Sequence, residues 1–92
     1  MEKECAIVLY NGRVQGIGFR YTCRYLAKGF SITGYVKNLE DGCVELVAEG
    51  SREEINRFLQ MIDESDLKPF IRHRTLEWQS ATGKWTDFHV VH

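Results

Sequence analysis

The chain has 92 residues and a formal net charge of −1, and 43% of its residues are hydrophobic, a proportion typical of a globular protein. This length predicts one domain over residues 1–92, with a core one layer thick in which helices pack against a sheet. The balanced charge excludes non-specific electrostatic binding to nucleic acid, which needs a basic domain. No apolar run approaches the ~18 residues that a membrane-spanning helix needs.

The absence of a membrane-spanning run and of a signal peptide favours a cytoplasmic protein. Residues 1–5 lack the basic-then-apolar order of a signal peptide. The cysteines are odd in number and include no close pair and no Cys-x-x-Cys motif. This pattern favours reduced, unpaired thiols over a disulfide framework or a zinc site. The three are Cys5, Cys23 and Cys43.

The first half of the chain predicts two strands separated by a helix. The apolar run 5–10, bounded by Asn11-Gly12, is typical of a buried strand. Residues 19–28 show helical spacing, and Gly29 falls near the position that glycine takes at a helix C-terminus. Residues 32–39 return to a strand pattern. The apolar face of the helix comprises Phe19, Cys23, Leu26, Ala27 and Phe30.

A hairpin leads into the second half. Asp41-Gly42 is a strong hairpin signal, followed by a strand over 43–48. After Pro69, extended stretches at 72–79 and 87–91 are separated by a polar turn. One face of the strand 43–48 carries Val44, Leu46 and Ala48.

A second helix is predicted after this strand. The segment from Ser51 to Glu54 fits a capping box, in which Ser51 caps the helix and Glu54 reaches back to the N–H of Ser51. The helix is expected to end near Glu64. Its buried face, at helical spacing, comprises Ile55, Phe58, Leu59 and Ile62.

The elements follow the order strand, helix, strand, strand, helix, strand, with a short extra strand at the C-terminus. This order predicts an α+β, ferredoxin-like βαββαβ sandwich in which both helices cover one face of an antiparallel sheet. The first and third strands are then antiparallel neighbours, so Cys5 and Cys43 fall at opposite ends, too far apart for a disulfide. The first two strands run parallel, so segment 12–20 and Asn38 are expected at one edge of the sheet.

The glycine-rich segment between the first strand and the first helix has the features of an anion site. Gly12, Gly16 and Gly18 let successive backbone N–H groups turn toward a ligand, and the helix N-terminus adds unpaired donors. Arg20 supplies a planar cation that matches phosphate oxygens two at a time. The segment matches neither a Rossmann fingerprint nor a Walker A motif. By themselves, these residues are equally compatible with a structural strand-to-helix turn.

Asn38, at the end of the second predicted strand, is the other candidate. Its amide both donates and accepts hydrogen bonds and is able to hold a water, whereas the alternative is an asparagine that stabilises the hairpin turn. No cysteine is followed six residues later by an arginine, as a cysteine-type phosphatase requires. His89 and His92 fall on opposite sides of the last strand and are expected to be exposed, so no metal site is predicted.

Two segments of the sequence together carry a family signature. Residues 12–20 read Gly-Arg-Val-Gln-Gly-Ile-Gly-Phe-Arg, and residues 34–44 read Gly-Tyr-Val-Lys-Asn-Leu-Glu-Asp-Gly-Cys-Val. This pair closely resembles the signature of the acylphosphatase family. The resemblance covers most of residues 5–64, and the basic segment 68–80 departs from the usual pattern.

The resemblance implies an acylphosphatase (EC 3.6.1.7), which hydrolyses the carboxyl–phosphate bond of acyl phosphates to a carboxylate and inorganic phosphate without a cofactor. It implies that Arg20 and loop N–H groups bind the substrate phosphate and that Asn38 orients the attacking water. The implied phosphate-binding residues are Gln15, Gly16, Ile17, Gly18, Phe19 and Arg20. The expected partner is a small acyl phosphate, with no nucleic acid or membrane partner, and the expected state is a monomer.

Two other interpretations stay open. A phosphate- or RNA-binding ferredoxin-like module without catalysis has the same strand order. However, Phe19 at a helix start is misplaced for a base-stacking aromatic residue of a central strand, and a basic surface is missing. A domain akin to the acylphosphatase-like domains of larger carbamoyl-transfer proteins keeps the phosphate site, but the length of 92 residues disfavours it.

Overall fold

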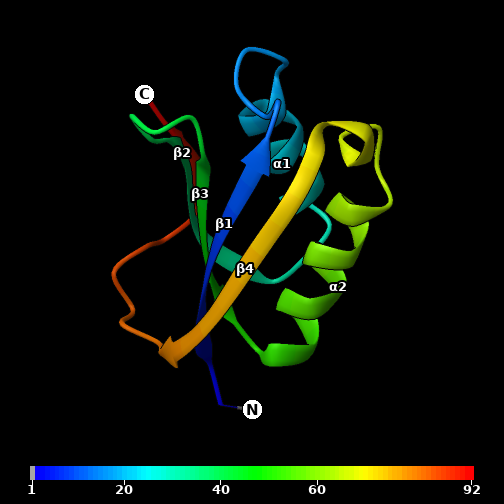
Figure 1. The fold of residues 1–92 in the computed structure, drawn as a ribbon. Coiled ribbons are helices and arrows are strands. Elements are labelled where there is room, and N and C mark those ends of the chain that lie inside the picture. The colour runs from blue at the N-terminus through cyan, green and yellow to red at the C-terminus, as the bar shows by residue number, and fades with distance from the viewer. Residues whose placement is uncertain (1) are drawn as a thin grey trace.

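Five strands in one sheet and two helices make up the computed structural model, which describes residues 2–92 (Figure 1). Helix α1 (Phe19–Ala27) follows the first strand, α2 (Arg52–Asp63) follows the third, and a 3₁₀ helix (Lys68–Phe70) precedes the fourth. The strands are β1 (Glu4–Gly12), β2 (Ile32–Asn38), β3 (Val44–Gly50), β4 (Ile71–Ser80) and β5 (Phe88–Val91).

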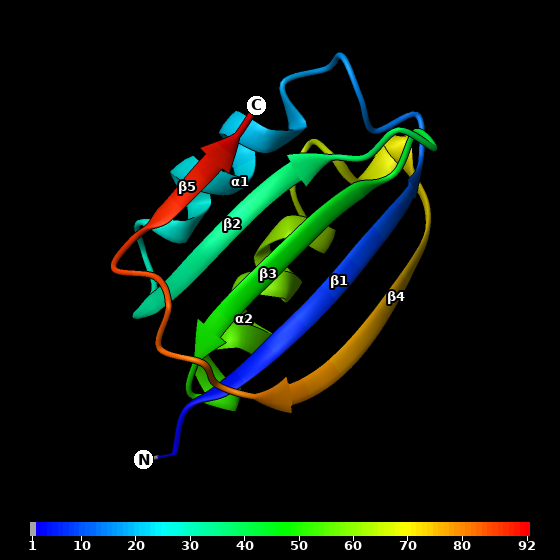
Figure 2. The ribbon, with the colours of Figure 1, turned by 90° about the vertical axis from the view of Figure 1, so that its left-hand side faces the viewer.

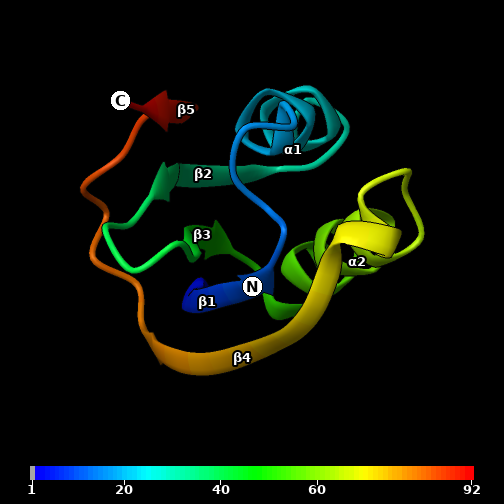
Figure 3. The same ribbon diagram turned by 45° about the horizontal axis from the view of Figure 1, so that its top comes forward.

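The strands lie side by side in the order β4-β1-β3-β2-β5. β1 pairs antiparallel with β3 and β4, and β2 pairs antiparallel with β3, which confirms the βαββαβ sandwich. The predicted extra strand, β5, instead adds to β2 in parallel, so the sheet is mixed. The reason is that β4 ends at the same end of the sheet where β2 begins, and the β4–β5 connection crosses this end from one edge of the sheet to the other. Figures 2 and 3 show both helices on one face and this connection on the opposite side.

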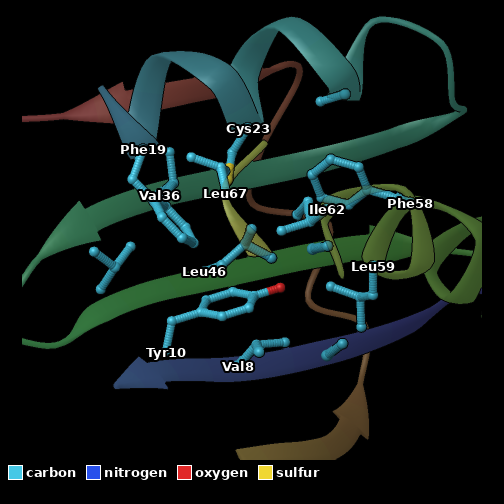
Figure 4. Packing of buried hydrophobic residues seen from close by; sticks show 14 of the residues in the cluster. Val8, Tyr10, Phe19, Cys23, Val36, Leu46, Phe58, Leu59, Ile62 and Leu67 are labelled. Atoms are coloured by element: carbon cyan, nitrogen blue, oxygen red, sulfur yellow. The ribbon is translucent and has the colours of Figure 1, made fainter. Parts of the chain in front are cut away.

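A hydrophobic core fills the space between the helices and the sheet (Figure 4). The helical faces predicted from residue spacing are the buried ones, and Leu26 and Phe30 pack partly buried against them. Burying a side chain of this size contributes about 1.5–3 kcal/mol, so the apolar stripe of each helix determines which face meets the sheet. The buried side chains include Val8, Tyr10, Val36, Leu46, Phe19, Cys23, Phe58, Leu59 and Ile62.

The helix ends differ in two details from the prediction. Ser51 Oγ caps α2 as predicted, accepting a hydrogen bond from the N–H of Glu54 at 3.2 Å. The Glu54 carboxylate, however, accepts from the N–H of Ser31 at 2.9 Å rather than from that of Ser51, because the chain entering β2 passes beside this helix end. Gly29 follows the C-cap residue Lys28, but without the positive φ typical of a C-terminal glycine.

The three cysteines are free. Cys5 lies opposite Glu49 at one end of the β1–β3 pair, whereas Cys43 Sγ donates to Asn11 Oδ1 at 3.0 Å at the other end, as the topology predicts. Burial and the nearby Glu49 carboxylate raise the pKa of Cys5 to about 11, and burial raises the pKa of Cys23 as well. Both groups are therefore neutral thiols. Within residues 2–92, no helix is both long enough and apolar enough to cross a membrane.

Candidate active site

The ends of the parallel strands β1 and β2 meet the start of α1 at one edge of the sheet. Figure 2 shows the loop after β1, the end of β2 and the end of β5 together at this edge. A hollow of about 90 Å³ lies there. The loop and Asn38 are thus brought together, as the parallel pair predicts. The residues that line the hollow are Val14, Gly16, Gly18, Phe19, Arg20, Tyr21 and Asn38.

Two glycines shape the loop. Gly16 and Gly18 have φ angles of 79° and 81°, in the left-handed region that other residues rarely adopt. Gly18 is the N-cap of α1, and no side chain caps this helix. None of the backbone N–H groups of residues 15–20 donates a hydrogen bond to an acceptor in residues 2–92. Free N–H groups at a helix N-terminus are the donor set typical of an anion site.

Arg20 is the cation of the hollow. It is half-buried in the first turn of α1, and its Nη1 donates to the backbone carbonyl of Val91 at 3.0 Å. This bond orients the guanidinium while leaving its other N–H groups for a ligand. None of the ion pairs in the described part of the chain involves Arg20. Its positive charge is therefore not neutralised by a carboxylate of residues 2–92.

Asn38 closes the hollow from the end of β2, opposite Val44 in the β2–β3 pair. Its Oδ1 is buried and accepts no hydrogen bond from the residues that the structure describes. A buried oxygen in this state costs about 1–3 kcal/mol, so its place in the wall of a hollow points to a partner outside the fold. The hairpin turn is held instead by Asp41, whose Oδ1 accepts from the N–H of Cys43 at 3.0 Å.

Gln15 and Ile17 do not line the hollow, although both belong to the predicted phosphate-binding set. The Gln15 side chain donates to the backbone carbonyls of Leu39 and Cys43, at 2.8 and 2.9 Å. Ile17 is 37% exposed. The contribution that these two positions can make to phosphate binding is therefore limited to their backbone N–H groups. Phe19 lines the hollow, but its ring is buried against Tyr10, with the ring centroids 5.0 Å apart.

Sequence reasoning missed two residues at this edge. Tyr21 lines the hollow, and its hydroxyl lies 3.3 Å from Nε2 of His92. His92 is exposed, as expected, yet it sits beside the hollow because β5 pairs with β2 and ends next to α1. No periodicity in the sequence signals this contact, which joins residues 71 positions apart.

The side chains that line the hollow include no Asp, Glu, His or Cys. They therefore supply no carboxylate or imidazole base and no thiol nucleophile. Cys23, one turn along α1, is fully buried, and burial raises the pKa of its thiol. In residues 2–92, no group of three or more His, Cys, Asp and Glu side chains is arranged to hold a metal ion. The chemistry that these residues support is binding and positioning by neutral and cationic donors.

Comparison with known families gives the family of the chain. A family model described as Acylphosphatase matches residues 6–90. The chain belongs to the acylphosphatase family. Acylphosphatases hydrolyse acyl phosphates and release phosphate, so the chain is assigned to the acid anhydride hydrolases of EC 3.6.1.7. The fold and the activity implied by the two sequence segments are both confirmed.

Relatives and solved structures agree with this membership. An acylphosphatase from Syntrophotalea carbinolica is 39% identical over 83 residues, which are 90% of this chain and 90% of that protein. The structure of an acylphosphatase from Bacillus subtilis matches with a TM-score of 0.87 at 27% identity, over 97% of this chain and 99% of the other. A Coxiella burnetii acylphosphatase matches with a TM-score of 0.83 at 33% identity, over 98% and 94%.

Proposed function

We propose that Arg20 and the backbone N–H groups of residues 15–20 bind the phosphoryl group of an acyl phosphate, and that Asn38 orients the water that attacks it. One observation carries the proposal. A cation without a carboxylate partner, N–H groups without acceptors and a buried oxygen without a donor all lie at one hollow of about 90 Å³. The cation and the N–H groups are able to donate hydrogen bonds to the oxygens of a phosphoryl group. The buried oxygen is able to accept one from a water molecule.

The phosphoryl group lies at the start of α1, where its negative charge is stabilised by the loop N–H groups and the helix dipole. Arg20 donates to two of its oxygens through the nitrogens that Val91 does not engage. Gln15, Gly16, Ile17, Gly18 and Phe19 contribute backbone N–H groups only. The Gln15 side chain is already bonded to the hairpin.

Asn38 Oδ1 accepts a hydrogen bond from the water and directs its lone pair at phosphorus. The new bond forms between the water oxygen and phosphorus. The bond between phosphorus and the acyl oxygen breaks, and its electron pair leaves with the carboxylate. Both water protons end on the phosphate product, so a dianionic acyl phosphate and water give a carboxylate and dihydrogen phosphate. Positioning and charge stabilisation supply most of the catalysis of phosphoryl transfer.

We propose that residues 1–92 act as one catalytic domain, as a monomer, and without nucleic acid. Phe19, the aromatic residue in the glycine-rich segment, is buried at the start of α1 and packs at a tilt against Tyr10, so its ring is not exposed to stack on a base. Three free thiols suit a reducing compartment such as the cytoplasm.

A direct assay tests this function. The purified chain is incubated with benzoyl phosphate or acetyl phosphate in the presence of a metal chelator, and phosphate release is followed. Steady turnover under these conditions supports the proposal. A chain that hydrolyses neither substrate but binds a labelled RNA in a parallel titration is a binding module, and the proposal is then wrong. Sedimentation of the same sample tests the monomer.

A further inference from the structure

The hollow is smaller than the substrate that it serves. A volume of about 90 Å³ equals about three waters at liquid density. Pockets that enclose a drug-sized ligand measure ~300–1,000 Å³. The hollow therefore holds the phosphoryl group and the attacking water, and the acyl group extends past its rim.

The acyl group leaves on the side away from Asn38. In-line displacement places the leaving oxygen opposite the attacking water. All other lining residues belong to the segment 14–21. In this segment the side chains of Val14 and Phe19 are buried, whereas Tyr21 is 51% exposed. Tyr21 is thus the large side chain that both lines the hollow and reaches solvent beside it.

His92 contacts the Tyr21 side chain. The Tyr21 hydroxyl and His92 Nε2 lie 3.3 Å apart, and the two ring centroids are 6.1 Å apart at an interplanar angle of 46°. His92 follows directly on Val91, whose carbonyl oxygen accepts from Arg20. The end of β5 therefore positions the phosphate-binding cation and the neighbouring aromatic ring together.

We propose that Tyr21, positioned by His92, binds the acyl group and makes the enzyme prefer aromatic acyl phosphates over small aliphatic ones. The inference rests on the proposed function of Arg20 and Asn38. An aromatic acyl group packs on the exposed face of the Tyr21 ring. An acetyl group presents only one methyl group, so it gains little binding free energy from this ring. The ring contacts a part of the substrate that does not react, so its effect is on the choice of substrate.

The test compares kcat/KM for benzoyl phosphate with kcat/KM for acetyl phosphate. Tyr21→Ala is expected to lower the benzoyl-to-acetyl ratio by about 3- to 10-fold, the range of an aromatic pair. Tyr21→Phe keeps the ring but loses the hydroxyl contact with His92, and it is expected to give a ratio between those of the wild type and Tyr21→Ala. Tyr25→Ala is the matched control, because Tyr25 lies one turn further along α1, is 71% exposed and does not line the hollow. It is expected to behave as the wild type.

Competitive inhibition by inorganic phosphate separates acyl binding from damage to the hollow. Phosphate has no acyl group, so Tyr21→Ala is expected to keep the wild-type inhibition constant within about twofold. If Tyr21→Ala lowers both substrates equally, or weakens inhibition by phosphate as much as it lowers the ratio, Tyr21 is a structural residue and the inference fails. If the wild type is active and Tyr21→Ala leaves the benzoyl-to-acetyl ratio of kcat/KM unchanged, the inference about Tyr21 fails while the proposed function stands. A wild type inactive on both substrates overturns the proposed function and the inference together.

Discussion

The side-chain amide of Gln15 donates a 2.8 Å hydrogen bond to the backbone carbonyl of Leu39, the residue that follows Asn38. The same amide donates to the carbonyl of Cys43 at 2.9 Å. One side chain thus connects the loop between β1 and α1 to the β2–β3 hairpin. It holds the loop near Asn38, and the proposed positioning of the water depends on the distance between the loop N–H groups and Asn38.

Gln15→Glu keeps the shape of this side chain but sets a carboxylate against two carbonyl oxygens. We expect the free energy of unfolding to fall by about 1–3 kcal/mol, because both acceptors lose their donor. We expect kcat/KM to fall by at least about 10-fold, because a shift of the loop misplaces the phosphoryl group. Urea unfolding and initial rates measure the two effects. Gln79→Glu also removes a donated side-chain hydrogen bond, to Glu77 at 2.6 Å, but at an exposed position of β4, so it is the control for kcat/KM and is expected to leave it unchanged.

Arg20→Ala removes the preorganised cation of the hollow. Loss of one such donor costs about 3–4 kcal/mol, so kcat/KM for benzoyl phosphate is expected to fall by about 100- to 1,000-fold. Steady-state kinetics measure this loss. Arg24→Ala, an exposed arginine one turn further along α1, is expected to have little effect. Near-normal hydrolysis by Arg20→Ala excludes the role proposed for this residue.

Asn38→Ala is expected to separate activity from stability. The Asn38 Oδ1 has no hydrogen-bond donor within residues 2–92, so the fold loses no bond to this atom. We expect the free energy of unfolding to change by less than about 1 kcal/mol. The rate is expected to fall by about 100-fold because the water is no longer oriented. Kinetics and urea unfolding are compared with those of Asn56→Ala, an exposed position on α2. Equal losses of stability and activity indicate a structural asparagine instead.

The rate on acetyl phosphate is expected to vary little between about pH 5.5 and about pH 7.5, because arginine and asparagine side chains do not change charge in this range. Within residues 2–92, His92 is within hydrogen-bond distance of Tyr21, which lines the hollow, so His92→Gln tests whether this histidine contributes to the rate. A pH–rate profile of the wild type and of His92→Gln measures the dependence. A steep limb near pH 6.5 that disappears in His92→Gln contradicts the proposed mechanism.

Glu49 is predicted to make stability depend on pH in acid. Its buried carboxylate accepts from the N–H and hydroxyl of Thr82, both at 2.8 Å, and from the N–H of Gly83 at 2.9 Å. Burial acts to raise the pKa of Glu49, but these hydrogen bonds outweigh it and hold the pKa below its ordinary value of 4.5. The folded state therefore binds the proton less readily than the unfolded state. The stabilisation is full above about pH 4.5 and is lost as the pH falls through the folded pKa.

Glu49→Gln is expected to lower the free energy of unfolding at pH 7 by about 1.5–3 kcal/mol, the range for hydrogen bonds to a charged group. It is also expected to flatten the decline in stability in acid. Urea unfolding across this pH range measures both effects. Glu53→Gln, on the exposed face of α2, is the control. A wild-type decline that Glu49→Gln leaves unchanged assigns the acid sensitivity to other carboxylates.

The sequence by itself determined the elements and predicted the two halves of the candidate site. Periods of two and of 3.6 residues placed the strands and the buried faces of α1 and α2, because each pattern reports which side of an element faces the core. The glycines before α1, Arg20 and Asn38 predicted the site, because parallel strands bring their C-terminal ends to one edge. A resemblance in two segments was then enough to give the family that the comparison confirms.

The tertiary structure alone decided how these parts are held together. β5 joins β2 in parallel, so Val91 orients Arg20 and His92 meets Tyr21 across 71 residues of chain. The side chain of Gln15, which the family resemblance implies as a phosphate-binding residue, donates its hydrogen bonds to the hairpin instead. Such contacts depend on the directions of segments far apart in the chain. Local periodicity records the face that each segment buries but not the neighbour that its ends will meet.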